Sequence, residues 1–146
     1  MVSCASSRSG AFDLHYTSDF HLARPYGNES GTGWGVGDGR VTGERVTGTA
    51  QWSNQPARHG DGAMLPNARG VVATDDGAEV VFDLTGRTVF VDRDGEEVGR
   101  QLLLVLLEGE DGRYAWLNNA VCVGDGVISA ETMTMHLDVF QCVSEL

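Results

Sequence analysis

Residues 67–84 read NARGVVATDDGAEVVFDL, and this stretch predicts a β-hairpin. Apolar and polar residues alternate on both sides of the central TDDG, as they do in strands that bury one face. The two aspartates suit a type I turn, and Gly77 can take the left-handed conformation that closes a bulged hairpin. In the second strand, Val80, Phe82 and Leu84 share the apolar face. The stretch therefore predicts antiparallel strands at 67–74 and 78–84.

Similar turn signals recur along the chain, at 92–95 (DRDG), 109–112 (GEDG) and 124–126 (GDG). No long segment has a convincing helical period, apart from an ambiguous stretch at 98–107. Strands joined by short turns favour an up-and-down sheet, and closure into a barrel removes its exposed edges. We therefore predict an all-β fold, a single antiparallel up-and-down β-barrel with an interior pocket. It would span residues 11–146, after a disordered N-terminal tail at 1–10.

The composition excludes several functions. The chain has 146 residues and a net charge of −11, and its ten basic residues are all arginine. No basic stripe exists to bind nucleic acid or an anionic membrane surface, and no apolar run is long enough to cross a bilayer. The absence of lysine excludes Schiff-base chemistry. The three cysteines form no CxxC pair, which favours a reducing cytoplasm. Because no HxH, HExxH, P-loop or Rossmann pattern is present, we expect neither a metal nor a cofactor.

Residues 113–118, RYAWLN, suggest a ligand site. Read as a strand, they place Tyr114, Trp116 and Asn118 on one face, about 3.3 Å per residue along the backbone. Two aromatic rings and a carboxamide suit the wall of a small-molecule pocket. The same pattern also fits an ordinary barrel core, where Tyr and Trp are buried with a hydrogen-bonding partner. Both interpretations stay open.

A glycine-rich segment, 27–43, carries seven glycines in 17 positions. Such a segment predicts tight turns or a mobile flap, and a flap would form a lid over the pocket mouth. Trp34 lies within it and would either cap a ligand or pack on a partner subunit. The leucine-rich run at 102–107 is either a strand covered on both faces or a subunit contact, so we expect a homodimer.

The charged residues of the hairpin allow two readings. Arg69 shares a face with apolar neighbours, so its guanidinium needs either Glu79 or Asp83 as a partner, or an oxygen of a ligand. Glu79 and Asp83 are solvated if the face of Phe82 is the core. They become general acid–base candidates with raised pKa values if the opposite face lines the lumen.

The last strand carries a second acid–base candidate. His136 and Asp138 stand two residues apart on one face. Such neighbours point in parallel and usually do not bond directly. A catalytic His136 and a solvated one are both compatible with this spacing.

The chain also resembles a known family, in its residues 69–78 (RGVVATDDGA), Gly86, 113–118, Val123-Gly124 and 138–140. These look like the bacterial family catalogued as domain of unknown function 3237. Residues 39–43 and Gln51-Trp52 fall where that family carries a Gly-x-x-x-Gly step and an Asp-Trp pair. The similarity covers roughly Phe12 to Val143.

The resemblance implies a compact antiparallel β-barrel, often dimeric, with an interior pocket, no obligatory cofactor and no settled reaction. The chain departs from the family pattern at Gln51, where aspartate is expected. If that aspartate carries a proton in relatives, the chemistry here rests on another group.

These observations lead to a functional hypothesis. The protein would act on a small, apolar oxygenated intermediate of specialised metabolism, by cofactor-free isomerisation, cyclisation or dehydration. Five residues would carry the chemistry, namely Arg69, Tyr114, Asn118, Glu79 and Asp83. Four would shape the substrate site, namely Trp52, Trp116, Trp34 and Phe82. The alternatives are a non-catalytic barrel that binds a similar ligand and a structural dimer with a filled interior.

Overall fold

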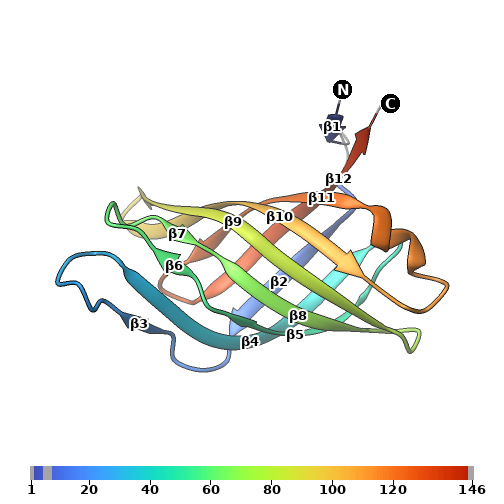
Figure 1. The fold of residues 1–146 in the computed structure, drawn as a ribbon, viewed down its shortest axis with the longest axis horizontal. Helices are drawn as coiled ribbons and strands as arrows, with labels where there is room; N and C mark the ends of the chain where they lie inside the picture. The colour runs from blue at the N-terminus through green and yellow to red at the C-terminus, as the bar shows by residue number, and fades with distance from the viewer. Residues whose placement is uncertain (1, 5–7, 145–146) are drawn as a thin grey trace.

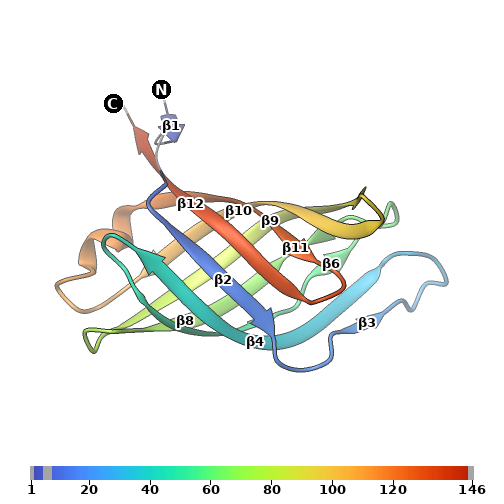
Figure 2. The same cartoon turned by 180° about the vertical axis from the view of Figure 1, so that it is seen from behind.

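The computed structural model describes residues 2–4 and 8–144 of the chain. Eight strands form a closed antiparallel ring, in which each strand pairs with the next and the last pairs with the first (Figures 1 and 2). They are β2 (Gly10–Tyr16), β4 (Gly31–Gly43), β5 (Gly48–Asn54), β8 (Asn67–Thr74), β9 (Glu79–Arg93), β10 (Glu96–Glu108), β11 (Val121–Ser129) and β12 (Thr134–Ser144). The predicted up-and-down barrel is confirmed.

The hairpin at 67–84 forms as its turn chemistry predicts. Strands β8 and β9 pair with Ala73 opposite Glu79. Gly77 has a φ of 91°, the left-handed conformation expected at that turn. The Val80, Phe82 and Leu84 side chains point inward and are each exposed by 1% or less. The face of Phe82 is therefore the core, and the opposite face of β9 is the outside of the barrel.

The glycine-rich segment is a barrel strand, so the prediction of a flap is wrong for residues 31–43, which form β4. Its buried glycines make room for aromatic rings from neighbouring strands. A Cβ at Gly35 would lie 2.7 Å from the Tyr16 ring, and one at Gly37 would lie 2.5 Å from the Trp52 ring. Glycine is needed here because the rings occupy the space that a side chain would fill.

Three short strands extend one end of the barrel. Strand β3 (His21–Ala23) pairs with β4, while β6 (Ala57–Arg58) and β7 (Met64–Leu65) connect β4 to β9. We call this end the mouth; it lies on the left in Figure 1. The opposite end, where the 3₁₀ helix η1 (Ala115–Asn119) lies, is called the base.

The predicted strand at 113–118 is wrong, because most of this run forms η1. The N–H of Leu117 donates to the carbonyl of Tyr114, and that of Ala120 donates to Leu117, each at 3.0 Å. A three-residue period replaces the two-residue period of a strand. As a result Tyr114 and Leu117 are buried and Asn118 is exposed, so the expected row of side chains does not form.

Part of the expected disordered tail is ordered. Residues 2–4 form β1 (Val2–Cys4), which pairs with the end of β12, beyond the barrel wall (Figure 1). Residues 1 and 5–7 of that tail lie outside the described residues. Within the described part of the chain, no helix is long and apolar enough to span a membrane.

Candidate functional site

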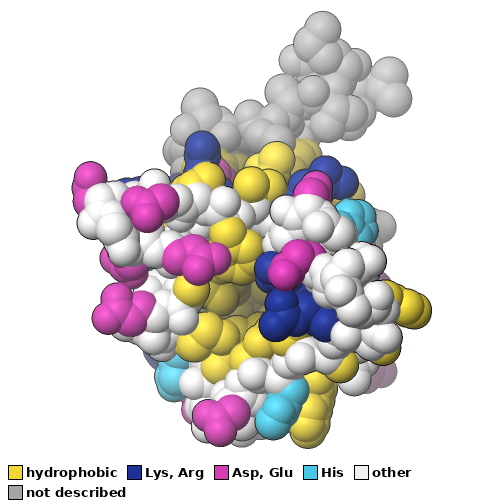
Figure 3. Space-filling model, turned by 90° about the vertical axis from the view of Figure 1, so that its left-hand side faces the viewer, with side chains coloured by type: hydrophobic (Ala, Val, Ile, Leu, Met, Phe, Trp, Pro, Cys, Tyr) yellow, Lys and Arg dark blue, Asp and Glu magenta, His cyan; other side chains and the backbone are white. Residues whose placement is uncertain are grey.

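A cleft opens at the mouth of the barrel. It has a volume of about 200 Å³ and borders a narrower inner space of about 30 Å³. Figure 3 looks into this end and shows a hollow with a largely hydrophobic lining and charged side chains at its rim. The cleft and the inner space share six lining residues, namely Tyr16, Asn54, Pro66, Gln101, Ile128 and Met133. Polar groups from three strands thus enter an apolar cavity, as in many small-molecule sites.

Tyr16 is the first of these polar groups, at the end of β2. Its phenol oxygen accepts a hydrogen bond from Asn54 Nδ2 at 2.9 Å. Asn54 Oδ1 in turn accepts from the Asn67 backbone N–H at 2.9 Å, which fixes the carboxamide. Because the phenol oxygen is an acceptor in this bond, its own O–H is left to donate elsewhere. The pKa of Tyr16 is raised overall, because burial raises it by more than the hydrogen bond from Asn54 lowers it. Tyr16 is therefore a neutral hydrogen-bond donor at physiological pH.

Gln101 is the second polar group, on the inner face of β10. Its residue is only 6% exposed, and its Nε2 donates to Thr88 Oγ1 at 3.1 Å. Its Oε1 is the one buried side-chain oxygen or nitrogen among the described residues that has no hydrogen-bond partner. Exchanging the two amide atoms would only turn the unpaired acceptor into an unpaired donor, because the Thr88 hydroxyl can play both roles. An unpaired buried amide group costs about 1–3 kcal/mol, so it calls for an explanation.

Aromatic side chains form the wall beside Tyr16. Its ring meets Trp52 edge to face at 4.7 Å and Phe20 at 5.3 Å between ring centres. Trp52 Nε1 donates to the Asp38 carbonyl at 3.0 Å. Because the indole N–H already donates to this carbonyl, Trp52 contributes only the apolar surface of its ring to the inner space.

The rim of the cleft is charged. Arg58 donates from Nε and Nη2 to Glu29 Oε2 at 3.2 and 2.8 Å, and this bond holds the pKa of Glu29 below its usual value. Glu97 is exposed at the start of β10, on the same face as Gln101. The four residue steps from Glu97 to Gln101 span about 13 Å of strand. The rim thus supplies a cation, Arg58, that is paired with Glu29, and a carboxylate, Glu97, that has no cation partner within the described part of the chain.

The predicted site residues are divided between the interior and the outside. Trp52 lines the inner space of the mouth. Phe82 packs in the middle of the barrel, where its ring meets Phe12 edge to face at 5.2 Å. It lines neither the cleft nor the inner space, so it acts as core.

Four other residues named in the sequence hypothesis lie on the outer surface. The Arg69 side chain is 77% exposed and its Nε donates to Asp83 Oδ1 at 2.7 Å, so the pairing within the hairpin is the correct alternative. Glu79 is also exposed on β9. Trp34 is 53% exposed and stacks on His21 at 5.6 Å between ring centres. These residues do not line the cleft, because the strand alternation turns them away from the lumen.

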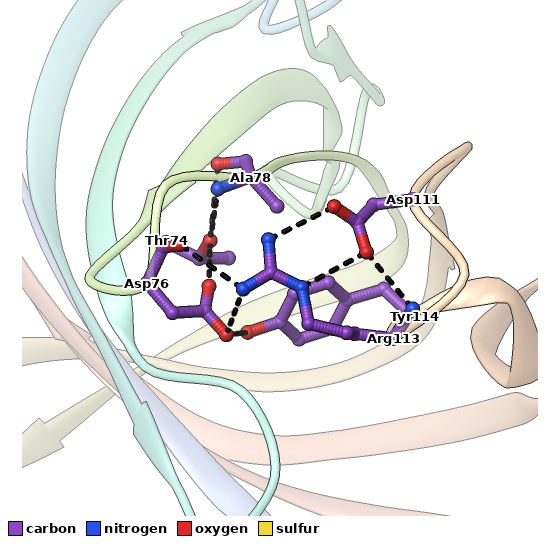
Figure 4. Close-up of polar contacts among 6 residues, drawn as sticks. All are labelled: Thr74, Asp76, Ala78, Asp111, Arg113 and Tyr114. Carbon is purple, nitrogen blue, oxygen red and sulfur yellow. Dashed lines mark hydrogen bonds and ion pairs between the residues drawn. The ribbon is translucent and has the colours of Figure 1, made fainter.

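Tyr114 belongs to a polar network at the base (Figure 4). Its O–H donates to Asp76 Oδ2 at 2.7 Å, and the Thr74 hydroxyl donates to Asp76 Oδ1 at 2.6 Å. These two bonds hold the pKa of Asp76 below its usual value. Arg113 pairs with Asp76 and with Asp111, whose pKa it lowers to about 2. The network ties η1 to the β8–β9 turn, at the end of the barrel away from the cleft.

The remaining predicted residues also lie at the base. Asn118 accepts from the Gly109 N–H at 2.9 Å and donates to the Gly109 carbonyl at 3.1 Å, which closes the loop before η1. Trp116 is half-buried beneath Arg45 and lines a second cavity. Gln51, where the family suggests aspartate, is exposed on the outer face of β5.

Three site residues were missed in the sequence, although a period-two signal exists for each of them. Tyr16 is in phase with Phe12 and Leu14, and Gln101 is in phase with Leu103 and Val105, all of which point inward. The ambiguous period of 98–107 concealed the inward position of Gln101. Asn54 is in phase with Ala50 and Trp52 on the inner face of β5, but its bond to Tyr16 joins two strands and is not visible in the sequence.

The fold and the cleft define a class of closed antiparallel β-barrel with a cleft at its mouth. The chain belongs to the family described as protein of unknown function (DUF3237), whose model matches residues 11–142. No curated protein matches the chain.

Several solved structures share the fold. A beta-barrel like protein from Acinetobacter baumannii AYE is 15% identical, with a TM-score of 0.84 over 98% of this chain and 97% of that one. A conserved protein of unknown function from Rhodopseudomonas palustris is 17% identical, with a TM-score of 0.80 over 97% and 99%. A structure described as an enzyme from Penicillium herquei is 15% identical, with a TM-score of 0.66 over 95% and 93%. At these identities the likeness concerns the fold.

Proposed function

We propose that the mouth cleft binds a small, neutral, largely apolar oxygenated molecule and that the protein rearranges this molecule without a cofactor. The reaction would be an isomerisation, a cyclisation or a dehydration of an intermediate of specialised metabolism. The observation that carries the proposal is Gln101, whose buried Oε1 lacks a partner among the described residues. A ligand hydroxyl would supply the missing hydrogen bond.

The chemistry follows from the groups that face the cleft. Tyr16 donates to a ligand carbonyl and stabilises the negative charge that develops on that oxygen. Its raised pKa keeps the phenol protonated, so Tyr16 acts as a donor and not as a base. Glu97 at the rim would take a proton from the carbon next to the carbonyl and return it at another position. The proton count is unchanged, which is an isomerisation that needs no cofactor.

The test uses a probe with both groups, 6-acetyl-2-naphthol, titrated calorimetrically. We expect Gln101→Leu and Tyr16→Phe each to weaken binding about tenfold, the effect of about 1.4 kcal/mol. Gln51→Leu is the matched control, because it makes the same change on the outer face. Equal affinities in the Gln101 and Gln51 variants would refute the site.

A non-catalytic binding barrel is the second candidate, favoured by the enclosed inner space and the scarcity of acid–base groups in it. The solved structure from Penicillium herquei is described as an enzyme, which supports catalysis. Mass spectrometry of the compound that co-purifies with the protein, before and after incubation, separates the two. A new product that Tyr16→Phe forms more slowly indicates catalysis, whereas an unchanged compound indicates binding alone.

We further propose that the protein is a homodimer through the outer face of β9 and β10. Leu102 is 61% exposed and Leu104 39%, which is a high exposure for neighbouring leucines on one strand. In register, Leu102 lies between Arg87 of β9 and Asp125 of β11. A two-fold copy would cover the leucines and bring opposite charges together across the axis.

A further inference from the structure

The barrel has a second cavity at its base, larger than the cleft at the mouth. Its volume is about 330 Å³. Side chains from five strands and η1 line it, among them the apolar Phe12, Val41, Leu107, Leu117 and Val139. Among the described residues, it shares no lining residue with the mouth cleft or its inner space. We call this cavity the base cup.

The two cavities are separated by packed side chains. Phe82, Val105 and Leu137 are exposed by 1% or less and belong to one hydrophobic cluster. Phe12 lines the base cup from its own side and meets the Phe82 ring. A molecule in the base cup therefore cannot reach Tyr16 or Gln101, so the base cup is a site of its own.

Arg45 gives the base cup its charge. Its guanidinium carbon lies 3.5 Å from the centre of the Trp116 ring, which is a close cation–π stack. The stack uses one face of the guanidinium and leaves the N–H edges available. Within the described part of the chain, no carboxylate or carbonyl pairs with these N–H groups. Trp116 thus holds a positive group at the edge of an apolar cavity.

Two other charged residues, Arg8 and Glu44, line the base cup. Arg8 is bound to Asp138 at 2.9 Å. Glu44 precedes Arg45 in the β4–β5 loop and is exposed, without an ion pair in the described residues. At the edge of its apolar interior the base cup therefore presents one guanidinium and one carboxylate, neither of which is ion-paired within the described residues.

We propose that the base cup is a second binding site, specific for a small carboxylic acid with an apolar body. The body would fill the apolar interior, and the carboxylate would accept two parallel hydrogen bonds from Arg45. The charge distinguishes this ligand from the neutral molecule proposed for the mouth. The base cup accordingly goes beyond the proposed function and does not depend on it.

The test uses 2-naphthoate as the probe and 2-acetonaphthone as a neutral molecule of similar shape. Calorimetry on the full chain measures both, with the Trp116 and Trp52 indole N–H signals followed by NMR. We expect 2-naphthoate to bind at least tenfold more tightly than 2-acetonaphthone to the base cup and to shift the Trp116 signal but not that of Trp52.

Charge variants assign the effect to one residue. We expect Arg45→Gln to weaken 2-naphthoate binding at least tenfold and Arg45→Lys to restore it only in part. Arg100→Gln is the matched control, because Arg100 is exposed on the outer face of β10 and carries the same charge. We expect less than a twofold effect from Arg100→Gln and none from Gln101→Leu.

Three results would overturn the proposal. The first is no binding of 2-naphthoate to the wild-type chain at millimolar concentration. The second is an equal loss in Arg45→Gln and Arg100→Gln, which would indicate a general effect of net charge. The third is competition between 2-naphthoate and 6-acetyl-2-naphthol, which would place both probes at the mouth.

Discussion

Gln101 is a polar residue in a position whose neighbours on the same face are apolar. Leu103, Val105 and Leu107 follow it along the inner face of β10, and all three are buried. Among the described residues, Thr88, opposite on β9, is the one whose side chain bonds to its amide. A leucine would fill a similar volume without an unpaired polar atom. Packing alone therefore does not account for a glutamine here, whereas the binding role proposed above would.

Replacing both members of this pair separates stability from binding. We expect Gln101→Leu with Thr88→Val to leave the free energy of unfolding unchanged or to raise it by up to about 1 kcal/mol, because neither polar group remains unpaired. The same double variant should bind 6-acetyl-2-naphthol at least tenfold more weakly than wild type. Urea denaturation and calorimetry check the two parts, and a loss of more than about 2 kcal/mol would contradict the argument.

His136 lies on the outer face of β12 between two carboxylates. Its Nδ1 is 2.6 Å from Asp13 and its Nε2 is 3.0 Å from Asp138, which also binds Arg8. The expectation that His136 and Asp138 would not bond directly is therefore wrong. The hydrogen bond to Asp13, followed by that to Asp138, raises the pKa of His136 above 6.5.

This shift predicts a pH dependence of stability. Because the folded-state pKa is the higher one, the contribution of His136 is complete below about pH 6.5 and is lost as the pH rises through the folded value. We expect the difference in unfolding free energy between wild type and His136→Gln to shrink over that range. Urea titrations at several pH values measure it, and a constant difference would contradict the assignment.

Among the elements, η1 shows how one turn of 3₁₀ helix changes the role of a motif. The network of Tyr114, Asp76 and Arg113 holds η1 against the β8–β9 turn (Figure 4). A strand would have carried Tyr114 and Trp116 to the same face. The 3₁₀ turn instead sends Tyr114 to the network and Trp116 to the base cup.

The network makes Tyr114 a stability residue. We expect Tyr114→Phe to lower the free energy of unfolding by about 1 kcal/mol, because it removes a hydrogen bond to a charged but exposed carboxylate. Tyr26→Phe is the matched control, since Tyr26 is 75% exposed, and it should change stability by less than about 0.5 kcal/mol. A weaker binding of the mouth probe to Tyr114→Phe would instead support the role first expected for Tyr114.

At the scale of the whole molecule, the closed barrel leaves two kinds of apolar surface. The interior is divided into two cavities by its packed centre, and the outer face of β10 carries exposed leucines. Because successive side chains of a strand point to opposite faces, the leucine-rich run 102–107 contributes residues both to the core and to the outer surface. Leu103, Val105 and Leu107 fill the core, while Leu102 and Leu104 face outward.

The outward leucines provide the test of the homodimer. We expect light scattering after size exclusion to give the mass of two chains for wild type and of one chain for Leu104→Glu. Val36→Glu is the matched control, because Val36 has the same 39% exposure as Leu104 but lies on β4. A single-chain mass for the wild type, or equal effects of both variants, would refute the interface.

The sequence alone determined the all-β class, the hairpin at 67–84 and the up-and-down order of the strands. Each of these depends on neighbouring residues, through a period of two and through turn chemistry at Gly77. The sequence also named Asp83 as one of the possible partners of Arg69, and the structure shows that pair. Local periodicity also grouped Val80, Phe82 and Leu84 on one face, but it left open whether that face or the opposite one lines the lumen, which the burial of these side chains decides.

The tertiary structure decided where the sites lie. Tyr16, Asn54 and Gln101 come from β2, β5 and β10, and only closure of the barrel brings them around one cleft. The bend of 113–118 into η1 also depends on a distant residue, Asp76. Such positions follow from contacts between remote segments, which no local pattern in the sequence records.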